Sequence, residues 1–226
     1  MIYITGDTHG EQNRMLWIER NIPFTKDDTL IICGDFGFLF RNNAAEHMFL
    51  DALNERGYTI CFVDGNHENF PAIYDYPVEI WNGGNIHRIR RNILHLMRGQ
   101  VYTIENKTFF VMGGAYSIDR PSRIRNISYW DEELPSNEEY QEAISNLKKY
   151  EYNVDYILTH TAPREIIRQM GYNPVSQDLE LTGFLEYILH EAKFRHWYFG
   201  HWHIDQQMTD CITALWFDMY KIHEIE

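Results

Sequence analysis

The chain has 226 residues, of which 44% are hydrophobic and 15% aromatic, so it can bury a full core and is not a disordered chain. Acidic residues outnumber basic ones by 33 to 20, and the formal net charge is −13. Because proteins that track along nucleic acid usually carry a basic face, this charge argues against long nucleic acid as a partner. Residues 87–126 depart from the average, with eight bases and two acids, and we expect an anionic ligand to be met there.

Cysteine usage and the N-terminal residues indicate the compartment. The three cysteines are odd in number and form no CxxC pair, which favours a reducing compartment over a disulfide framework. No stretch approaches the roughly 18 apolar residues of a membrane span. The first residues, MIYITGDTHG, lack the basic leader and apolar core of a secretion signal. The sequence therefore predicts a cytoplasmic protein with no membrane partner.

The first third of the chain alternates short apolar runs with helix-like segments. We expect strands over residues 2–5, 29–33 and 59–63, and helices over 11–20 and 43–55. This β-α-β-α-β order predicts a largely parallel central sheet with helices on its faces.

The rest of the chain predicts a second sheet. Residues 100–104 and 108–112 form a hairpin with polar residues at its turn. Ser136 and Glu139 make a capping box that opens a helix to about residue 150. Further along we expect strands at 155–159 and 196–199, helices at 163–170 and 178–193, and antiparallel strands at 211–217 and 219–222 that close the second sheet. The predicted fold is α/β, with two packed sheets covered by outer helices in one domain of residues 1–226.

Five polar motifs sit just past the ends of predicted strands. They are Asp7-Thr8-His9-Gly10, Gly34-Asp35, Gly65-Asn66-His67-Glu68, His160 and Gly200-His201-Trp202-His203. The carboxyl ends of strands in open α/β sheets form the ligand crevice, so these distant residues should gather on one rim. Each motif alone is weak, but five of the 11 histidines fall in this ordered set.

The residue types suit a metal centre. Carboxylate, amide and imidazole ligands suit Mn²⁺, Fe or Zn²⁺, and the absence of cysteine argues against structural zinc. In Asp7-x-His9 and His201-x-His203, both side chains lie on the same side of an extended strand end. Asp35 can bridge two ions through its two oxygens. Two ions about 3.5–4 Å apart clamp the attacking and leaving oxygens of a phosphoryl group, and a bridging water loses a proton near neutral pH to become the nucleophile.

The ordered blocks D-x-H, GD, GNH-[DE], H and GH-x-H resemble the signature of the calcineurin-like metallophosphoesterase superfamily, and the chain matches all five from Asp7 to His203. The resemblance implies a four-layer αββα sandwich of two mixed sheets flanked by helices, and a dinuclear centre. It implies that His67 is not a ligand but contacts the phosphate and protonates the leaving oxygen. It implies one ion bound by Asp7, His9, Asp35 and His203, and a second bound by Asp35, Asn66, His160 and His201.

The chain departs from the family pattern at two places. Many relatives carry a second Asp three residues after the bridging one, where it orients the catalytic histidine. That position here is Phe38, which leaves Asp64 and Glu68 as candidate partners of His67. The arginines that the protein serine/threonine phosphatases carry in GD-x-VDRG and RGNHE are also missing, which argues against a phosphoprotein and favours a small phosphorylated or nucleotide-like substrate.

A glycine-led loop offers candidate substrate contacts besides Asn66 and His67. Gly113 and Gly114 precede Arg120 and Arg123, and arginine can bind phosphate bidentately; the alternative is a solvated surface loop. Tyr116 and Trp130 are candidates for stacking on a base or aryl leaving group, although a core position is the alternative that we favour.

Two other functions compete with a metal-dependent phosphoesterase. A non-catalytic scaffold on the same fold would tolerate lost ligands, yet every ligand and His67 is present here. Amidohydrolases carry an H-x-H motif near the N-terminus of a longer TIM barrel, whereas here it lies near the C-terminus. The sequence leaves open the physiological substrate, the choice between monoester and diester, the native metal (with manganese favoured) and the oligomeric state.

Overall fold

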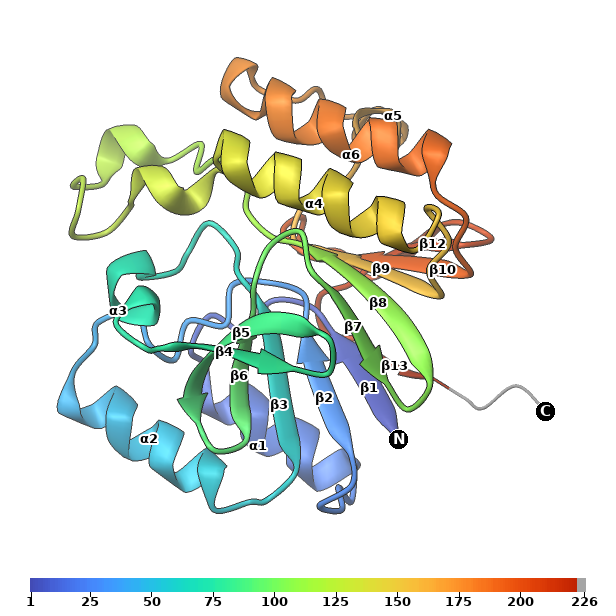
Figure 1. The fold of residues 1–226 in the computed structure, drawn as a ribbon. Helices are drawn as coiled ribbons and strands as arrows, with labels where there is room; N and C mark the ends of the chain where they lie inside the picture. The colour runs from blue at the N-terminus through green and yellow to red at the C-terminus, as the bar shows by residue number, and fades with distance from the viewer. Residues whose placement is uncertain (223–226) are drawn as a thin grey trace.

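The computed structural model describes residues 1–222, in which two mixed β-sheets pack face to face between outer helices (Figure 1). The first sheet has seven strands in the order β13 (Met219–Ile222), β1 (Ile2–Thr5), β2 (Thr29–Ile32), β3 (Thr59–Val63), β6 (Ile93–Leu96), β5 (Gly84–Arg90) and β4 (Val78–Trp81). The second has six, in the order β11 (Gln206–Thr209), β12 (Ile212–Ala214), β10 (His196–Phe199), β9 (Tyr156–Thr159), β8 (Lys107–Met112) and β7 (Val101–Ile104). The predicted α/β sandwich is confirmed.

The helices form the two outer layers of the sandwich. The first sheet is covered by α1 (Gln12–Asn21), α2 (Ala44–Asn54) and α3 (Phe70–Tyr74), and the second by α4 (Asn137–Lys149), α5 (Arg164–Gln169) and α6 (Leu179–Glu191) (Figure 1). The predicted capping box opens α4, since the Ser136 side chain accepts from the Glu139 N–H and the Glu139 carboxylate accepts from the Ser136 N–H. Three short 3-10 turns complete the described helices, at Arg120–Ser122, Asp131–Glu133 and Ser176–Asp178.

Most of the predicted strands are buried on both faces, which explains why they are continuous apolar runs. On β1, Ile2 and Ile4 belong to the core between the two sheets, whereas Tyr3 packs in the core that includes Met15 and Ile18 of α1. A third apolar cluster lies between the second sheet and α4, α5 and α6. Within residues 1–222, no helix is both long enough and apolar enough to cross a bilayer.

The last two strands differ from the prediction. We expected residues 211–217 and 219–222 to pair antiparallel and close the second sheet, and this was wrong. Instead β12 runs parallel to β10, and β13 crosses to the first sheet and pairs antiparallel with β1. The Asp205 carboxylate accepts from the N–H groups of residues 216, 217 and 218, and these bonds hold the turn that leads the chain from one sheet to the other.

Parallel pairing fixes where the polar motifs end up. Neighbouring strands β1, β2 and β3 are parallel in the first sheet, and so are β9 and β10 in the second. The carboxyl ends of these five strands therefore lie at one edge of the sandwich, which is where all five motifs follow them.

Candidate metal centre

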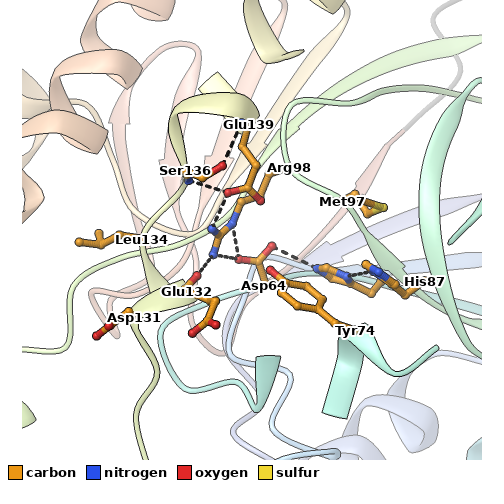
Figure 2. Close-up of a pocket in the computed structure, with 11 residues that line it drawn as sticks. Asp64, Tyr74, His87, Met97, Arg98, Asp131, Glu132, Leu134, Ser136 and Glu139 are labelled. Carbon is orange, nitrogen blue, oxygen red and sulfur yellow. Dashed lines mark hydrogen bonds and ion pairs between the residues drawn. The ribbon is translucent and has the colours of Figure 1, made fainter. Parts of the chain in front are cut away.

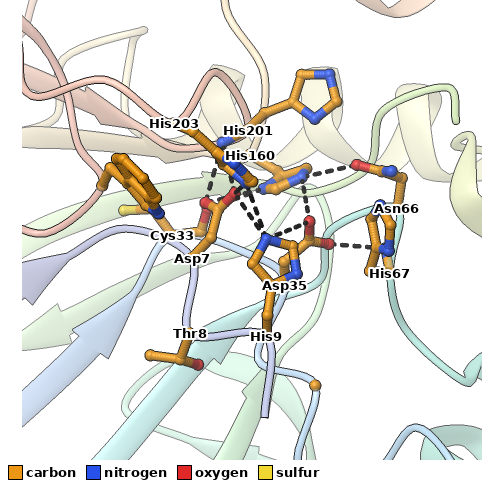
Figure 3. Close-up of polar contacts among 12 residues, drawn as sticks. Asp7, Thr8, His9, Cys33, Asp35, Asn66, His67, His160, His201 and His203 are labelled. Atoms are coloured by element: carbon orange, nitrogen blue, oxygen red, sulfur yellow. Dashed lines mark hydrogen bonds and ion pairs between the residues drawn. The ribbon is translucent and has the colours of Figure 1, made fainter. Parts of the chain in front are cut away.

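Two compact groups of potential ligands lie at this edge (Figure 3). In the first group, His9 Nε2 lies 2.9 Å from His203 Nε2, and His203 Nε2 lies 3.2 Å from Asp7 Oδ2. The third distance, from His9 Nε2 to Asp7 Oδ2, is 3.7 Å. Ligands at right angles around an ion with bonds of about 2.1 Å lie about 3 Å apart, so these three atoms fit around one cation.

The second group contains Asp7, Asp35 and His160, all buried. His160 Nδ1 lies 3.0 Å from the Cys33 carbonyl oxygen, which can only accept, so Nδ1 carries a proton and donates it there. His160 Nε2 then faces Asp35 Oδ2 at 3.5 Å and Asn66 Oδ1 at 3.0 Å. Three acceptor atoms that converge in a buried place need a cation or a proton between them, which is what a metal site provides.

The electrostatics of this group point the same way. Burial alone would lower the pKa of His160, but the carboxylates of Asp35 and Asp7 outweigh burial and raise it to about 10. Burial alone would raise the pKa of Asp35, but His160, His67 and His9 hold it well below its usual range. The position between these side chains therefore has a strongly negative potential that favours a positive ion.

Asp35 stands between the two groups, as a bridging ligand should. Its Oδ2 lies 3.5 Å from His160 Nε2 and 3.8 Å from His9 Nε2. Its Oδ1 accepts a hydrogen bond of 2.7 Å from the His67 N–H. The Oδ2 atom alone thus faces both groups, while Oδ1 fixes the carboxylate in place.

His201 contributes to the site through its backbone as well as its ring. Its N–H donates to both oxygens of Asp7, at 3.0 and 3.2 Å. Its ring lies at the edge of the second group, 5.0 Å from the His160 ring between centroids. Burial and the neighbouring His160 lower the pKa of His201 to about 3, so the ring is in the neutral form that can ligate a metal.

Asn66 is oriented by a residue that sequence reasoning missed. The Asn66 amide nitrogen donates to Ser117 Oγ at 2.9 Å, which turns Oδ1 towards His160. Ser117 is itself held by its own N–H, which donates to the buried Glu133 carboxylate at 2.8 Å. The glycine pair before Ser117 marked this loop as unusual, but no local pattern pointed to the serine.

Neither candidate partner contacts the His67 ring. Asp64 instead accepts from Arg98 and lies 3.1 Å from His95 (Figure 2), and Glu68 accepts from the N–H groups of residues 36 and 37. The group beside His67 is Arg123, whose Nη2 lies 2.8 Å from each ring nitrogen. The predicted substrate contact Arg123 is therefore next to the predicted acid.

The other cations of the basic span are largely neutralised within the fold. Arg98 pairs with Asp64 at 2.5 Å, and Arg120 pairs with the buried Glu133 at 2.7 Å. The Arg120 guanidinium also lies over the Tyr116 ring, 4.6 Å from its centroid. Tyr116 and Arg120 thus form a cluster of their own, and their role as substrate contacts remains a prediction. Trp130 is a core residue, 4% exposed.

The backbone around the centre is held in an unusual conformation. Asp35, His9, His201 and His203 have φ values of 47°, 47°, 70° and 49°, in the left-handed region that residues other than glycine avoid. Such residues cost about 1–3 kcal/mol each and cluster at functional sites. Gly34, at φ 99°, is in close contact as well, because a Cβ there would lie 1.9 Å from His160 Nδ1. The fold therefore tolerates strain to bring these side chains together.

Comparison with known proteins agrees with this geometry. A search among curated proteins found no match to the chain. The model of the calcineurin-like phosphoesterase family matches residues 1–205, a range that includes all five motifs. The chain therefore belongs to the calcineurin-like phosphoesterase family.

Proposed function

We propose that this protein hydrolyses a phosphoester with the help of two divalent metal ions. The observation that carries the proposal is the convergence of two ligand groups at Asp35, whose Oδ2 lies 3.8 Å from His9 Nε2 on one side and 3.5 Å from His160 Nε2 on the other. The proposed ligands of one ion are Asp7, His9, Asp35 and His203, and those of the other are Asp35, Asn66, His160 and His201. Mn²⁺ is the metal we favour, within a donor set that also suits Fe and Zn²⁺.

The ions would supply Lewis acidity to the phosphoryl group and lower the pKa of the attacking water. The chain's own residues do the rest. The attacking water releases a proton to solvent, and its oxygen forms a bond to phosphorus while the ester P–O bond breaks. The protonated His67 ring gives its proton to the leaving oxygen and takes another from solvent. The Arg123 guanidinium beside that ring places positive charge where the phosphoryl oxygens carry negative charge.

The test is turnover of bis-p-nitrophenyl phosphate and p-nitrophenyl phosphate with added Mn²⁺. We expect hydrolysis of at least one ester, and His67→Ala should slow it by about 10²- to 10⁴-fold without changing metal content. His47→Ala, which alters a histidine on α2 outside the groups that could hold a metal ion, is the matched control. A protein that binds Mn²⁺ yet hydrolyses neither ester would be a binding scaffold, which is the alternative reading of the fold.

A further inference from the structure

Two cavities lie on either side of His67 at the candidate metal centre. The larger has a volume of about 570 Å³ and includes Asn66, His201 and His203 in its wall. The smaller has a volume of about 330 Å³ and includes His9. His67 lines both. Both volumes are in the range of small-molecule sites, so the reacting phosphorus would have room for a substituent on each side.

The wall of the larger cavity beyond the metal ligands is largely apolar and aromatic, with Asp119, Asn173 and Asp178 as its polar members. Tyr172 and Trp202 lie with their ring centroids 5.0 Å apart, and Ile118, Pro174 and Val175 add aliphatic surface. None of the described residues in this wall is a lysine or arginine. A flat aromatic group attached directly to the phosphate would stack there, whereas a chain of further phosphates would find no counter-charge.

The smaller cavity has a different chemistry. It extends from His9 to the first turn of α2, and its exposed surface is mostly polar, from side chains such as Gln12, Arg41 and Asn43. Three phenylalanines, Phe38, Phe40 and Phe49, complete the wall. Ala45 lies in the same wall, where a larger side chain would project into the space. This cavity suits a polar substituent such as a sugar or polyol.

We propose that the substrate is a phosphodiester with two unlike substituents: an aromatic leaving group in the larger cavity and a polar group in the smaller one. This inference rests on the proposed phosphoesterase function. A monoester would leave one cavity unused. It would also bring a second negative charge to a centre where Arg123 is already shared with Asp119 and His67.

The experiment compares kcat/KM for bis-p-nitrophenyl phosphate and p-nitrophenyl phosphate in the full chain with Mn²⁺, in the wild type and two variants. The wild type should prefer the diester by at least about 10-fold. Ala45→Trp narrows the smaller cavity and should lower the ratio of kcat/KM for the diester to kcat/KM for the monoester by about 10-fold. Met48→Trp is its control, since Met48 is an exposed residue of the same helix outside the cavity.

The second variant tests the aromatic wall. Tyr172→Ala should raise KM for both aryl esters by about 10-fold with little change in kcat, and Tyr172→Phe should restore the wild-type KM. Turnover of neither ester with metal bound would overturn the phosphoesterase function itself. Turnover that favours the monoester, or an Ala45→Trp variant that slows both esters equally, would overturn the diester inference alone.

Discussion

Ser117 provides a sharp test of the centre because it holds a proposed ligand without being one. Ser117→Ala removes the acceptor of the Asn66 amide N–H, a hydrogen bond of 2.9 Å between side chains that are 1% and 3% exposed. A buried donor left without a partner costs about 1–3 kcal/mol. The amide is then free to rotate, and Oδ1 no longer faces His160.

The loss should appear in metal binding more than in folding. Groups that orient a ligand typically contribute 10- to 100-fold to metal affinity, or about 1.4–2.8 kcal/mol. We therefore expect Mn²⁺ titration calorimetry to show one weakened site in Ser117→Ala, with hydrolysis recovered at high Mn²⁺. Ser122→Ala, on the same loop but exposed, should bind Mn²⁺ like the wild type. A Ser117→Ala protein that melts earlier yet binds Mn²⁺ with wild-type affinity would refute the orienting role.

Three further predictions concern stability. Gly34→Ala should destabilise the protein by about 1–3 kcal/mol more than Gly57→Ala does in thermal melts. Both glycines have positive φ, but only at Gly34 would an added Cβ clash with a neighbouring atom, His160 Nδ1. Equal losses of stability in the two variants would contradict the clash. Burial and the neighbouring His95 lower the pKa of His87 to about 4, so its neutral form contributes stability above its unfolded pKa of about 6.5 that is lost as pH falls towards 4. Between pH 7 and pH 5 the free energy of unfolding in urea should fall by about 2 kcal/mol more in the wild type than in His87→Gln. Equal falls in the two proteins would show that His87 is not the group responsible. Chelation should lower the melting temperature, and added Mn²⁺ should restore it. At a free Mn²⁺ concentration of about a hundred times its dissociation constant, binding should add about 2.7 kcal/mol to the free energy of unfolding. An Asp35→Asn protein that is stabilised as strongly by Mn²⁺ would count against the proposed ligands.

Much of the fold could be read from the sequence because the central strands are buried on both faces. Runs such as those of β1 and β2 are apolar apart from one terminal threonine each, and the pattern is visible without knowledge of their neighbours. Strands β4, β5, β6 and β11 were not predicted. Exposed and buried positions alternate in β4 and β5, and β11 is largely exposed, so neither pattern is a continuous apolar run. The strand β6 is buried but has only four residues, one of them His95. The strand β13 was predicted but placed in the wrong sheet, because its partner lies more than 200 residues away.

The candidate site divides in the same way. The predicted ligands carry their chemistry in their own side chains, and a motif can reveal them. The groups that hold those side chains cannot be read locally, since Ser117 meets Asn66 and Arg123 meets His67 only after both sheets have formed. The positive charge of the basic span could not be assigned to free cations from the sequence, because most of its arginines pair with carboxylates in the fold, such as Asp64 for Arg98 and Asp51 for Arg90.

The crossing of β13 to the first sheet affects when the centre can form. Asp7 is synthesised long before residues 219–222, which flank the strand that precedes it on one side, and Thr5 Oγ1 donates to the carbonyl of residue 218. His203 is likewise made late. During synthesis the nascent chain must therefore keep an unpaired β1 edge and an incomplete set of ligands until residues 203–222 have emerged. The nascent chain therefore cannot bind metal ions with its full set of ligands until the late segments are made. A chain whose synthesis stops early would expose the edge of β1 and could aggregate through it.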